Sequence, residues 1–514
     1  MLCLLLGYSG LVKSADSLTP LELQGRQIYQ QGQDGSNVTI NVTLGLSNTS
    51  LSATRFACAN CHGAEGEGKV EGNLRIPPIT ASSLLATTSR AAYDDHRLAQ
   101  AISTGKSANS LPLDAAMPSY TMTKPQMTAL LAYLKRLGSA IDVDPGINQD
   151  AIQLGSVLPL TGALQATGTL LKATLDACVA EVNAQGLIYG RHLSIVTADS
   201  ASTGDGAATA TQRLLAENNT FALLARYADD SEMNPSRAES LVPDIAPITF
   251  MPKAQTTADA ARFYFLPSYV DQARALVDYG VRLPEFTQLK SKSALALIVG
   301  EQAVDKLTAE RVRQQAKMHG LIIESAVYWQ TGKIKPAVKA LLAKKPAALF
   351  FLGNMQELRA LNTLLLQTPQ RPILFSLMAM LGREVLQLPN LAFSQVFLAT
   401  PFADNAVAAQ QLTARLKPYA VALQNPSLQS VMCAAVDVVV EGLKRSGRQL
   451  SRLKFLAALE GLRNFPASFL PPLNFSPNSK IGVQGAYILG INQQGEQISQ
   501  SVWITPANAE PTKP

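Results

Sequence analysis

The second part of the chain alternates between short apolar runs and longer amphipathic stretches. This alternation begins near residue 152 and is typical of βαβ units that build a parallel sheet. So many strands exceed what one ordinary domain needs, and we expect two open α/β lobes. The expected strands are 153–158, 193–198, 221–224, 247–250, 294–299, 324–329, 347–352, 373–376 and 396–399, with helices between them at 164–185, 206–217, 269–282 and 303–320.

The first part of the chain follows a different pattern. Residues 21–138 read as helix-like pieces separated by glycine-rich loops. Residues 142–148 then contain Pro and Gly, which interrupt both helices and strands. We therefore expect a separate N-terminal domain, joined by a linker to the α/β lobes.

Composition narrows the class of protein. The 514 residues suffice for about three folding units, and 47% of them are apolar while 16% are charged, so large cores are expected. The net charge is +6, without a dense basic stripe, which argues against nucleic acid as a partner. No apolar run reaches the length of a membrane span.

Residues 1–12 are apolar and small residues follow, as at the end of an export signal, which predicts a periplasmic location.

The motif Cys58-Ala-Asn-Cys61-His62 carries the strongest chemical signal. Two cysteines at this spacing, followed at once by His, are typical of covalent haem attachment, with the His as an iron ligand. From the residue frequencies of this chain, the motif is expected by chance about 4 times in 10,000. A zinc site needs two more Cys or His nearby, and a redox dithiol normally sits in a thioredoxin-like βαβ unit. Neither alternative has that support here.

The order of motifs over residues 20–138 resembles class I cytochrome c. It consists of a Gly-Arg-Gln-Ile-Tyr helix, the Cys58–His62 motif, a proline pair, the Met117-Pro-Ser-Tyr loop and a last amphipathic helix. The resemblance implies an all-α domain with one covalent haem c. It implies Met117 as the distal iron ligand, with Met122 as a competitor, and Pro77 or Pro78 as the residue whose carbonyl orients His62. Residues 36–54 exceed the family pattern, so we expect a surface insertion there.

The chain from about residue 150 to 508 resembles the type I periplasmic binding proteins of the branched-chain amino-acid (leucine-binding) class. It opens with a strand and Pro-Leu-Thr161-Gly, a helix ending in Glu-Val-Asn-Ala-Gln-Gly and a Gly-Arg-His-Leu turn, and residues 485–495 match the closing hairpin. The resemblance implies a solute bound between two lobes, at the carboxyl ends of parallel strands. The ligand residues expected from these positions are Thr161, Arg226, Tyr227, Gln255, Glu301 and Glu357.

Several of these positions depart from the family pattern. Amino-acid binders place small hydroxyl residues after the third and fourth strands, where this chain has Arg226-Tyr227 and Lys253-Ala-Gln255. A branched-chain amino acid, another small acid or aromatic ligand, and a docked protein all stay open as occupants. Cys178 and Cys433 fall in helices that the family places in one lobe; a disulfide is open, but we expect buried free thiols.

The expected domains are an export signal at 1–19, the cytochrome at 20–140, a linker at 141–150, the lobes at 151–508 and a tail at 509–514. The function expected first is electron transfer by an exported c-type cytochrome whose lobes bind a solute or dock a redox partner, such as a dehydrogenase or a respiratory cytochrome. Two alternatives are the solute-binding component of an ABC importer and a ligand sensor linking lobe closure to the haem. We do not expect an enzyme, although a place beside a periplasmic dehydrogenase would fit.

Overall fold

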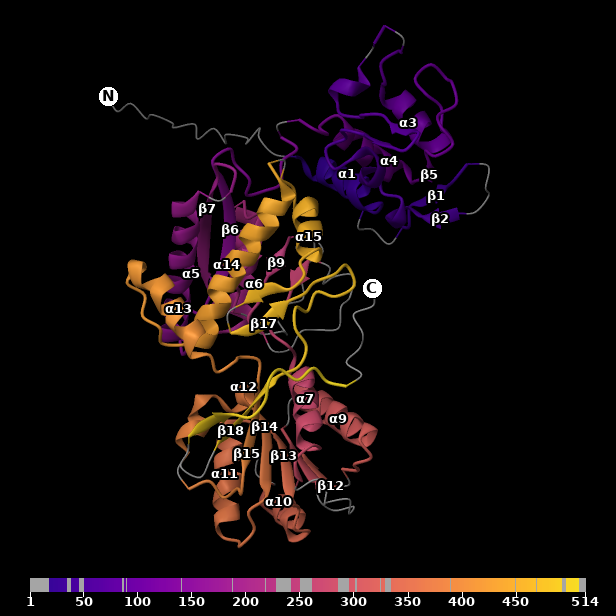
Figure 1. Cartoon of the computed structure of the whole chain (residues 1–514). Coiled ribbons are helices and arrows are strands. Elements are labelled where there is room, and N and C mark those ends of the chain that lie inside the picture. The colour runs from indigo at the N-terminus through magenta and orange to yellow at the C-terminus, as the bar shows by residue number, and fades with distance from the viewer. Residues whose placement is uncertain are drawn as a thin grey trace, which may run out of the picture. The chain divides into compact units, whose positions relative to one another are not determined.

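The computed structural model divides the chain into two compact units, Met1–Asp144 and Pro145–Pro514 (Figure 1). The division falls inside the segment expected as a linker. The expected export signal, the C-terminal tail, Gln255 and Glu301 lie outside the residues that the structure describes. Those described are 18–507 without 35–37, 46–49, 86, 89, 140, 187, 218, 228–241, 250–260, 285–294, 301–302, 324, 329–333, 389, 449, 468 and 492–495.

In the described part of the N-terminal unit, four α-helices form the frame. The first and last pack tightly, because Gly25 lies against the Ala129 carbonyl where a Cβ would come within 2.0 Å of the oxygen. Tyr29 and Tyr133, both fully buried, fill the core between them. The helices are α1 (Pro20–Gln31), α2 (Cys58–His62), α3 (Asp95–Thr104) and α4 (Lys124–Leu134), with 3-10 turns at Ala53–Arg55 and Ser82–Leu84.

The N-terminal unit is not all-α, contrary to the expectation. Strands β1 (Asn41–Thr43), β2 (Ser50–Ser52) and β5 (Ser119–Thr121) form an antiparallel sheet with β1 in the centre. Strands β3 (Lys69–Glu71) and β4 (Leu74–Ile76) form an exposed hairpin.

The expectation of a surface insertion at 36–54 was also wrong in part. Val42 and Ala53 are fully buried, and Ile40 is 1% exposed. This segment therefore supplies part of the core, although its many Asn, Thr and Ser residues made it read as a surface loop.

The first lobe of the second unit is built on a parallel sheet in the order β10-β9-β8-β6-β7. The fourth strand lies at Asp244–Ile245 and not at 247–250, because Ala246 takes a left-handed φ of 53° and Pro247 has no N–H to pair. The strands of this sheet are β6 (Ala151–Leu158), β7 (His192–Asp199), β8 (Ala222–Leu224), β9 (Asp244–Ile245) and β10 (Arg262–Phe263). The helices of the lobe are α5 (Gln165–Gln185), α6 (Gly204–Glu217), α13 (Ala406–Leu416), α14 (Pro426–Ser446) and α15 (Arg452–Glu460). A 3-10 turn at Lys417–Tyr419 and a hairpin of β16 (Phe465–Ala467) and β17 (Leu470–Leu473) complete it.

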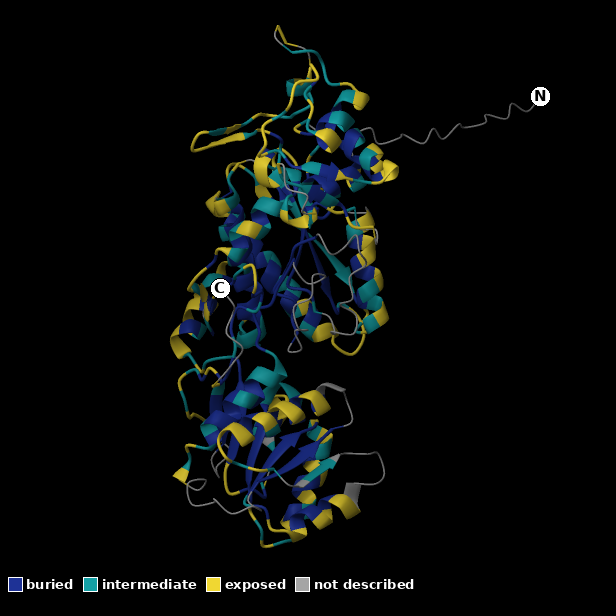
Figure 2. Cartoon of the chain, turned by 90° about the vertical axis from the view of Figure 1, so that its right-hand side faces the viewer, coloured by how far each residue is buried: buried dark blue, intermediate teal, exposed yellow. Residues whose placement is uncertain are grey.

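The second lobe has a sheet in the order β12-β11-β13-β14-β15-β18-β19, whose core strands are buried on both faces (Figure 2). Its first five strands run parallel and its last two run antiparallel, as the expected closing hairpin. The strands are β11 (Leu295–Val299), β12 (Ser325–Tyr328), β13 (Ala348–Leu352), β14 (Ile373–Leu377), β15 (Val396–Thr400), β18 (Tyr487–Ile491) and β19 (Gln497–Ser499); the helices are α7 (Tyr269–Gly280), α9 (Ala303–Met318), α10 (Ile334–Ala343), α11 (Met355–Leu366) and α12 (Met378–Leu381), followed by a turn at Arg383–Gln387.

Helix α14 is the central helix of the first lobe. Its length and composition would allow it to cross a membrane. However, 72% of its apolar 18-residue stretch is buried inside the fold. Cys433 on α14 forms a disulfide with Cys178 on α5, with a Cα–Cα distance of 5.5 Å. The expectation of free thiols was therefore wrong: the two helices pack so that these buried positions face each other.

Candidate functional site

The Cys58–His62 motif forms one short helix, α2. It begins at Cys58 and ends before Gly63, whose positive φ of 84° glycine adopts without strain. Cys58 and Cys61 are three residues apart, so their side chains lie on the same face of the helix. Neither thiol is in a disulfide; Cys58 is partly buried and Cys61 is exposed. Burial raises the pKa of the Cys58 thiol to about 11, although a hydrogen bond with Tyr120 works in the opposite direction.

The ring of His62 is held by a backbone carbonyl. Its Nδ1 lies 3.0 Å from the Pro77 oxygen, and because a carbonyl can only accept, Nδ1 carries the proton. The other nitrogen, Nε2, is then left with its lone pair for a metal. Burial lowers the pKa of His62, while the bond to Pro77 raises it. Of Pro77 and Pro78, the two prolines expected to orient this ring, it is Pro77 whose carbonyl contacts it.

Met117 lies in the loop between α3 and β5. It is half-buried and packs against the core of the N-terminal unit, together with Met122 and Met127. A turn centred on Asp114 holds the loop: the Met117 N–H donates to the Asp114 carbonyl at 2.9 Å, and the Ala116 N–H donates to its carboxylate. Burial therefore does not separate the three methionines, but only Met117 is in this Pro-containing loop.

The described residues fit a covalent haem. Two thiols outside any disulfide precede a neutral, buried imidazole whose Nε2 bonds to none of the described residues, and Cys58 and Met117 pack against the same apolar cluster. Thioether formation and axial ligation need these donors, and the ferrous iron of a c-type haem favours the soft sulfur of Met.

In the second unit, two expected ligand residues lie at strand ends of the first lobe. Thr161 is exposed after β6, and its hydroxyl donates to the Asp199 carboxylate at 2.6 Å. Asp199 also accepts from the N–H groups of Leu160, Thr161 and Ala201. Tyr227 is half-buried and packs against the lobe core, which raises the pKa of its phenol by desolvation. Asp199 was not anticipated; its position at the end of a strand was the available signal.

Arg226, expected from the sequence as a ligand residue, has partners within the first lobe. Its guanidinium is buried and bonds to both oxygens of Asp244, through Nε at 3.3 Å and Nη2 at 2.5 Å. Nη1 donates to the Thr211 hydroxyl at 3.0 Å. Arg262 approaches the same carboxylate at 3.5 Å. The Arg226 guanidinium, which a ligand carboxylate would need as its partner, is thus bonded to Asp244 and Thr211 inside the lobe.

Glu357 also has a local partner. It is the third residue of α11, where its carboxylate accepts from the Asn354 N–H at 2.9 Å, while Asn354 accepts from the Glu357 N–H. This reciprocal pair caps the helix. Its position after a strand made Glu357 an expected ligand residue, but the same position is where a helix N-terminus needs a cap.

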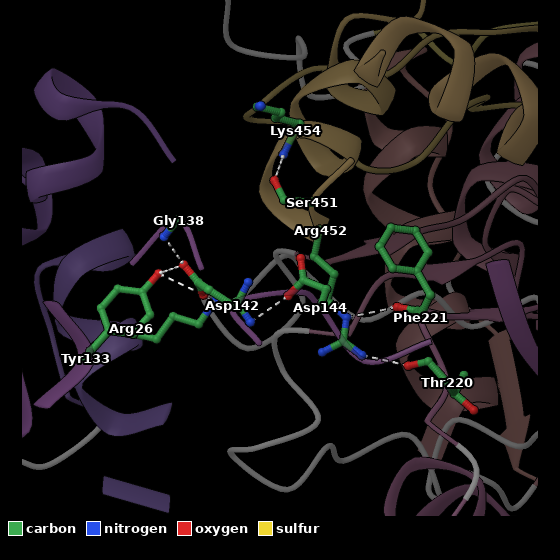
Figure 3. Close-up of polar contacts among 10 residues, drawn as sticks. All are labelled: Arg26, Tyr133, Gly138, Asp142, Asp144, Thr220, Phe221, Ser451, Arg452 and Lys454. Atoms are coloured by element: carbon green, nitrogen blue, oxygen red, sulfur yellow. Dashed lines mark hydrogen bonds and ion pairs between the residues drawn. The ribbon is translucent and has the colours of Figure 1, made fainter. Parts of the chain in front are cut away.

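A buried polar cluster lies where the N-terminal unit ends (Figure 3). Arg26 pairs with Asp144 at 3.0 Å and with Asp142 at 3.5 Å, and Asp142 also accepts from the Tyr133 hydroxyl and the Gly138 N–H. Desolvation raises the pKa of Asp142 although Arg26 lowers it. In the second lobe, His319 lies within hydrogen-bonding distance of Asp278, with Nε2 2.7 Å from its carboxylate.

Comparison with known proteins matches each unit separately. A family model described as periplasmic binding protein matches residues 151–496, and one described as cytochrome c matches residues 51–138. Among curated proteins, none matches at a significant level.

The second unit has the fold of many solved structures. A leucine-binding protein from Thermotoga maritima is 16% identical, with a TM-score of 0.54 over 69% of this chain and 99% of its own. A branched-chain amino acid ABC transporter protein from Thermus thermophilus with bound valine is 17% identical, with a TM-score of 0.55 over 70% and 98%. A fatty acid ABC transporter substrate-binding protein from Thermomonospora curvata is 19% identical, with a TM-score of 0.55 over 71% and 95%. The chain therefore belongs to the periplasmic binding protein family and carries a cytochrome c domain before it.

Proposed function

We propose that this protein is an exported electron carrier whose haem is attached to Cys58 and Cys61 and ligated by His62 and Met117. The observation that carries the proposal is the buried imidazole of His62, which is oriented by Pro77 and lies directly after the Cys61 thiol and one helical turn after the Cys58 thiol. The haem, when bound, supplies a one-electron couple. The chain supplies the rest: His62 stays neutral, Pro77 fixes its tautomer, and the apolar cluster excludes water from the iron.

A closed pair of axial ligands distinguishes electron transfer from the binding or activation of small molecules. With His62 and Met117 both on the iron, no position remains for a gas or peroxide. We expect the ferrous full-length protein to keep its absorption spectrum under carbon monoxide. The Met117→Ala variant should bind carbon monoxide, because it leaves one position open. Met122→Ala is the matched control and should behave like the wild type.

Two outcomes of this experiment would contradict the proposal. Carbon monoxide binding by the wild type would show an open haem. Carbon monoxide binding by Met122→Ala but not by Met117→Ala would identify Met122, and not Met117, as the distal iron ligand. Either result is read from the same reduced spectra.

For the second unit, we propose that the two lobes bind a small solute in the manner of the family. The solved relatives named for leucine, valine and fatty acid show how widely this fold varies in ligand. Because Arg226 and Glu357 are engaged within the chain, their geometry favours a ligand without the paired α-carboxylate and α-ammonium of an amino acid. Thr161 and Tyr227 stay as proposed contacts, and Gln255 and Glu301 remain sequence-based proposals.

The alternative functions differ in how the two units are linked. A sensor requires solute binding to shift the haem potential, whereas an importer component with an accessory haem does not. A periplasmic dehydrogenase or respiratory cytochrome is the redox partner that we propose for the electron carrier. The haem motif favours electron transfer, since simple transport has no use for a redox cofactor.

A further inference from the structure

The small sheet of the N-terminal unit connects the two sides of the proposed haem site. Strand β2 ends at Ser52, one 3-10 turn and two residues before Cys58. Strand β5 begins at Ser119, two residues after Met117. Strand β1 lies between them and pairs with both, matching Val42 with Leu51 on one side and with Tyr120 on the other (Figure 1). The segment before the thiols and the segment after the methionine are thus strands of one sheet.

Burial and a side-chain hydrogen bond reinforce this connection. Val42 is 0% exposed and Tyr120 is 5% exposed, so the central cross-strand pair lies in the core. The Tyr120 hydroxyl donates to the Phe56 carbonyl at 2.5 Å, which ties β5 directly to the backbone two residues before Cys58. The Ala53 N–H donates to the Ile40 carbonyl at 2.9 Å. Displacing β5 would break the Val42–Tyr120 pairing and the bond from Tyr120 to Phe56 together.

The Met117 loop is therefore fixed at both ends. On its N-terminal side, the Asp114 turn holds it through the N–H groups of Ala116 and Met117. On its C-terminal side, β5 is held by β1 and by the bond from Tyr120 to Phe56. Without β1, the C-terminal side would have no strand partner among the described residues, because β5 pairs with β1 alone.

We propose that β1 and Tyr120 form a clamp that positions Met117 as the distal haem ligand. This inference rests on the proposed His/Met site and assigns strands β1 and β5 a role in retaining the ligand. Val42 and Tyr120 are positioning residues: neither is a proposed iron ligand, both hold the Met117 loop through β5, and Tyr120 also hydrogen-bonds with the Cys58 thiol. The clamp resists detachment of the methionine because opening the loop requires loss of buried cross-strand packing.

The test is displacement of Met117 by imidazole in the ferric, full-length protein. Loss of the sulfur-to-iron charge-transfer band gives the imidazole concentration at half displacement. Val42→Ala removes buried methyl groups opposite Tyr120 and should lower that concentration about tenfold. Tyr120→Phe keeps the ring but removes the bond to Phe56, and should lower it about fivefold. Val70→Ala makes the same chemical change as Val42→Ala at a side chain that is 70% exposed, and should stay within about twofold of the wild type.

The outcomes separate the clamp from the proposed function. Equal imidazole midpoints for Val42→Ala, Tyr120→Phe and Val70→Ala, in protein that shows the wild-type charge-transfer band, would overturn the clamp and leave the His/Met site standing. Absence of that band from the wild type would overturn the site and the clamp with it. Tyr120→Phe keeps the test decisive if Val42→Ala fails to fold, because it leaves the packing of the ring in place.

Discussion

Replacing Cys58 and Cys61 together by Ser is expected to abolish covalent haem attachment. Each thiol adds its S–H across one vinyl group of the haem, and serine hydroxyls do not do so. The remaining described cysteines, Cys178 and Cys433, are joined to each other and offer no substitute. Mass measurement of denatured full-length protein, made with a c-type haem maturation system, should show the added haem in the wild type and essentially none in the double variant.

The matched control is the variant in which Cys178 and Cys433 are both changed to Ser. It loses the same number of cysteines and should keep the haem, although the first lobe loses the stabilisation of its disulfide. Haem that stays attached in the Cys58→Ser, Cys61→Ser variant would refute the assignment of these thiols. Haem loss in the control alone would place attachment elsewhere.

The largest effect on stability is expected from Asp244→Ala. Asp244 is 1% exposed and its carboxylate contacts the buried guanidinium groups of Arg226 and Arg262. Removing one partner of a buried ion pair leaves uncompensated buried charge and costs about 3–5 kcal/mol. Asp176→Ala, which breaks an exposed ion pair with Lys172, should cost about 1 kcal/mol or less.

Chemical denaturation of the full chain measures the free energy of unfolding of the second unit, to which Asp244 belongs. Trp503 packs against the core of the first lobe, so a change in tryptophan fluorescence reports the unfolding of the second unit. Haem absorbance follows the first unit and should keep its unfolding midpoint in Asp244→Ala. Equal destabilisation by Asp244→Ala and Asp176→Ala would contradict the view that the Arg226 pair is a structural element of the first lobe.

Patterns with a strong chemical or periodic signal predicted the structure well. The strands β6, β7, β11, β13, β14 and β15 lie within two residues of their expected positions, since buried parallel strands read as continuous apolar runs. The haem motif forms a helix, and the expected proline carbonyl meets His62. Both results depend on local sequence, where spacing and residue type decide the outcome.

Features set by tertiary contacts were harder to predict. Strands β1 and β10 are two or three residues long and owe their pairing to partners far away in sequence. The identity of residues at strand ends did not show that Arg226 would turn inward to Asp244, 18 residues later. The disulfide between Cys178 and Cys433 spans 255 residues and follows from the packing of two helices. In each case the partner residue is distant in the sequence, so short-range sequence patterns do not reveal it.

The central claim is that the N-terminal domain carries single electrons through a covalent haem. A spectroelectrochemical titration of the full-length protein tests it most directly. The account predicts a reversible transition between oxidised and reduced c-type spectra that follows a one-electron slope of about 59 mV per decade. A protein that matures without a covalent chromophore, or one whose chromophore does not cycle reversibly, would contradict the account and leave a periplasmic binding protein with an N-terminal domain of another function.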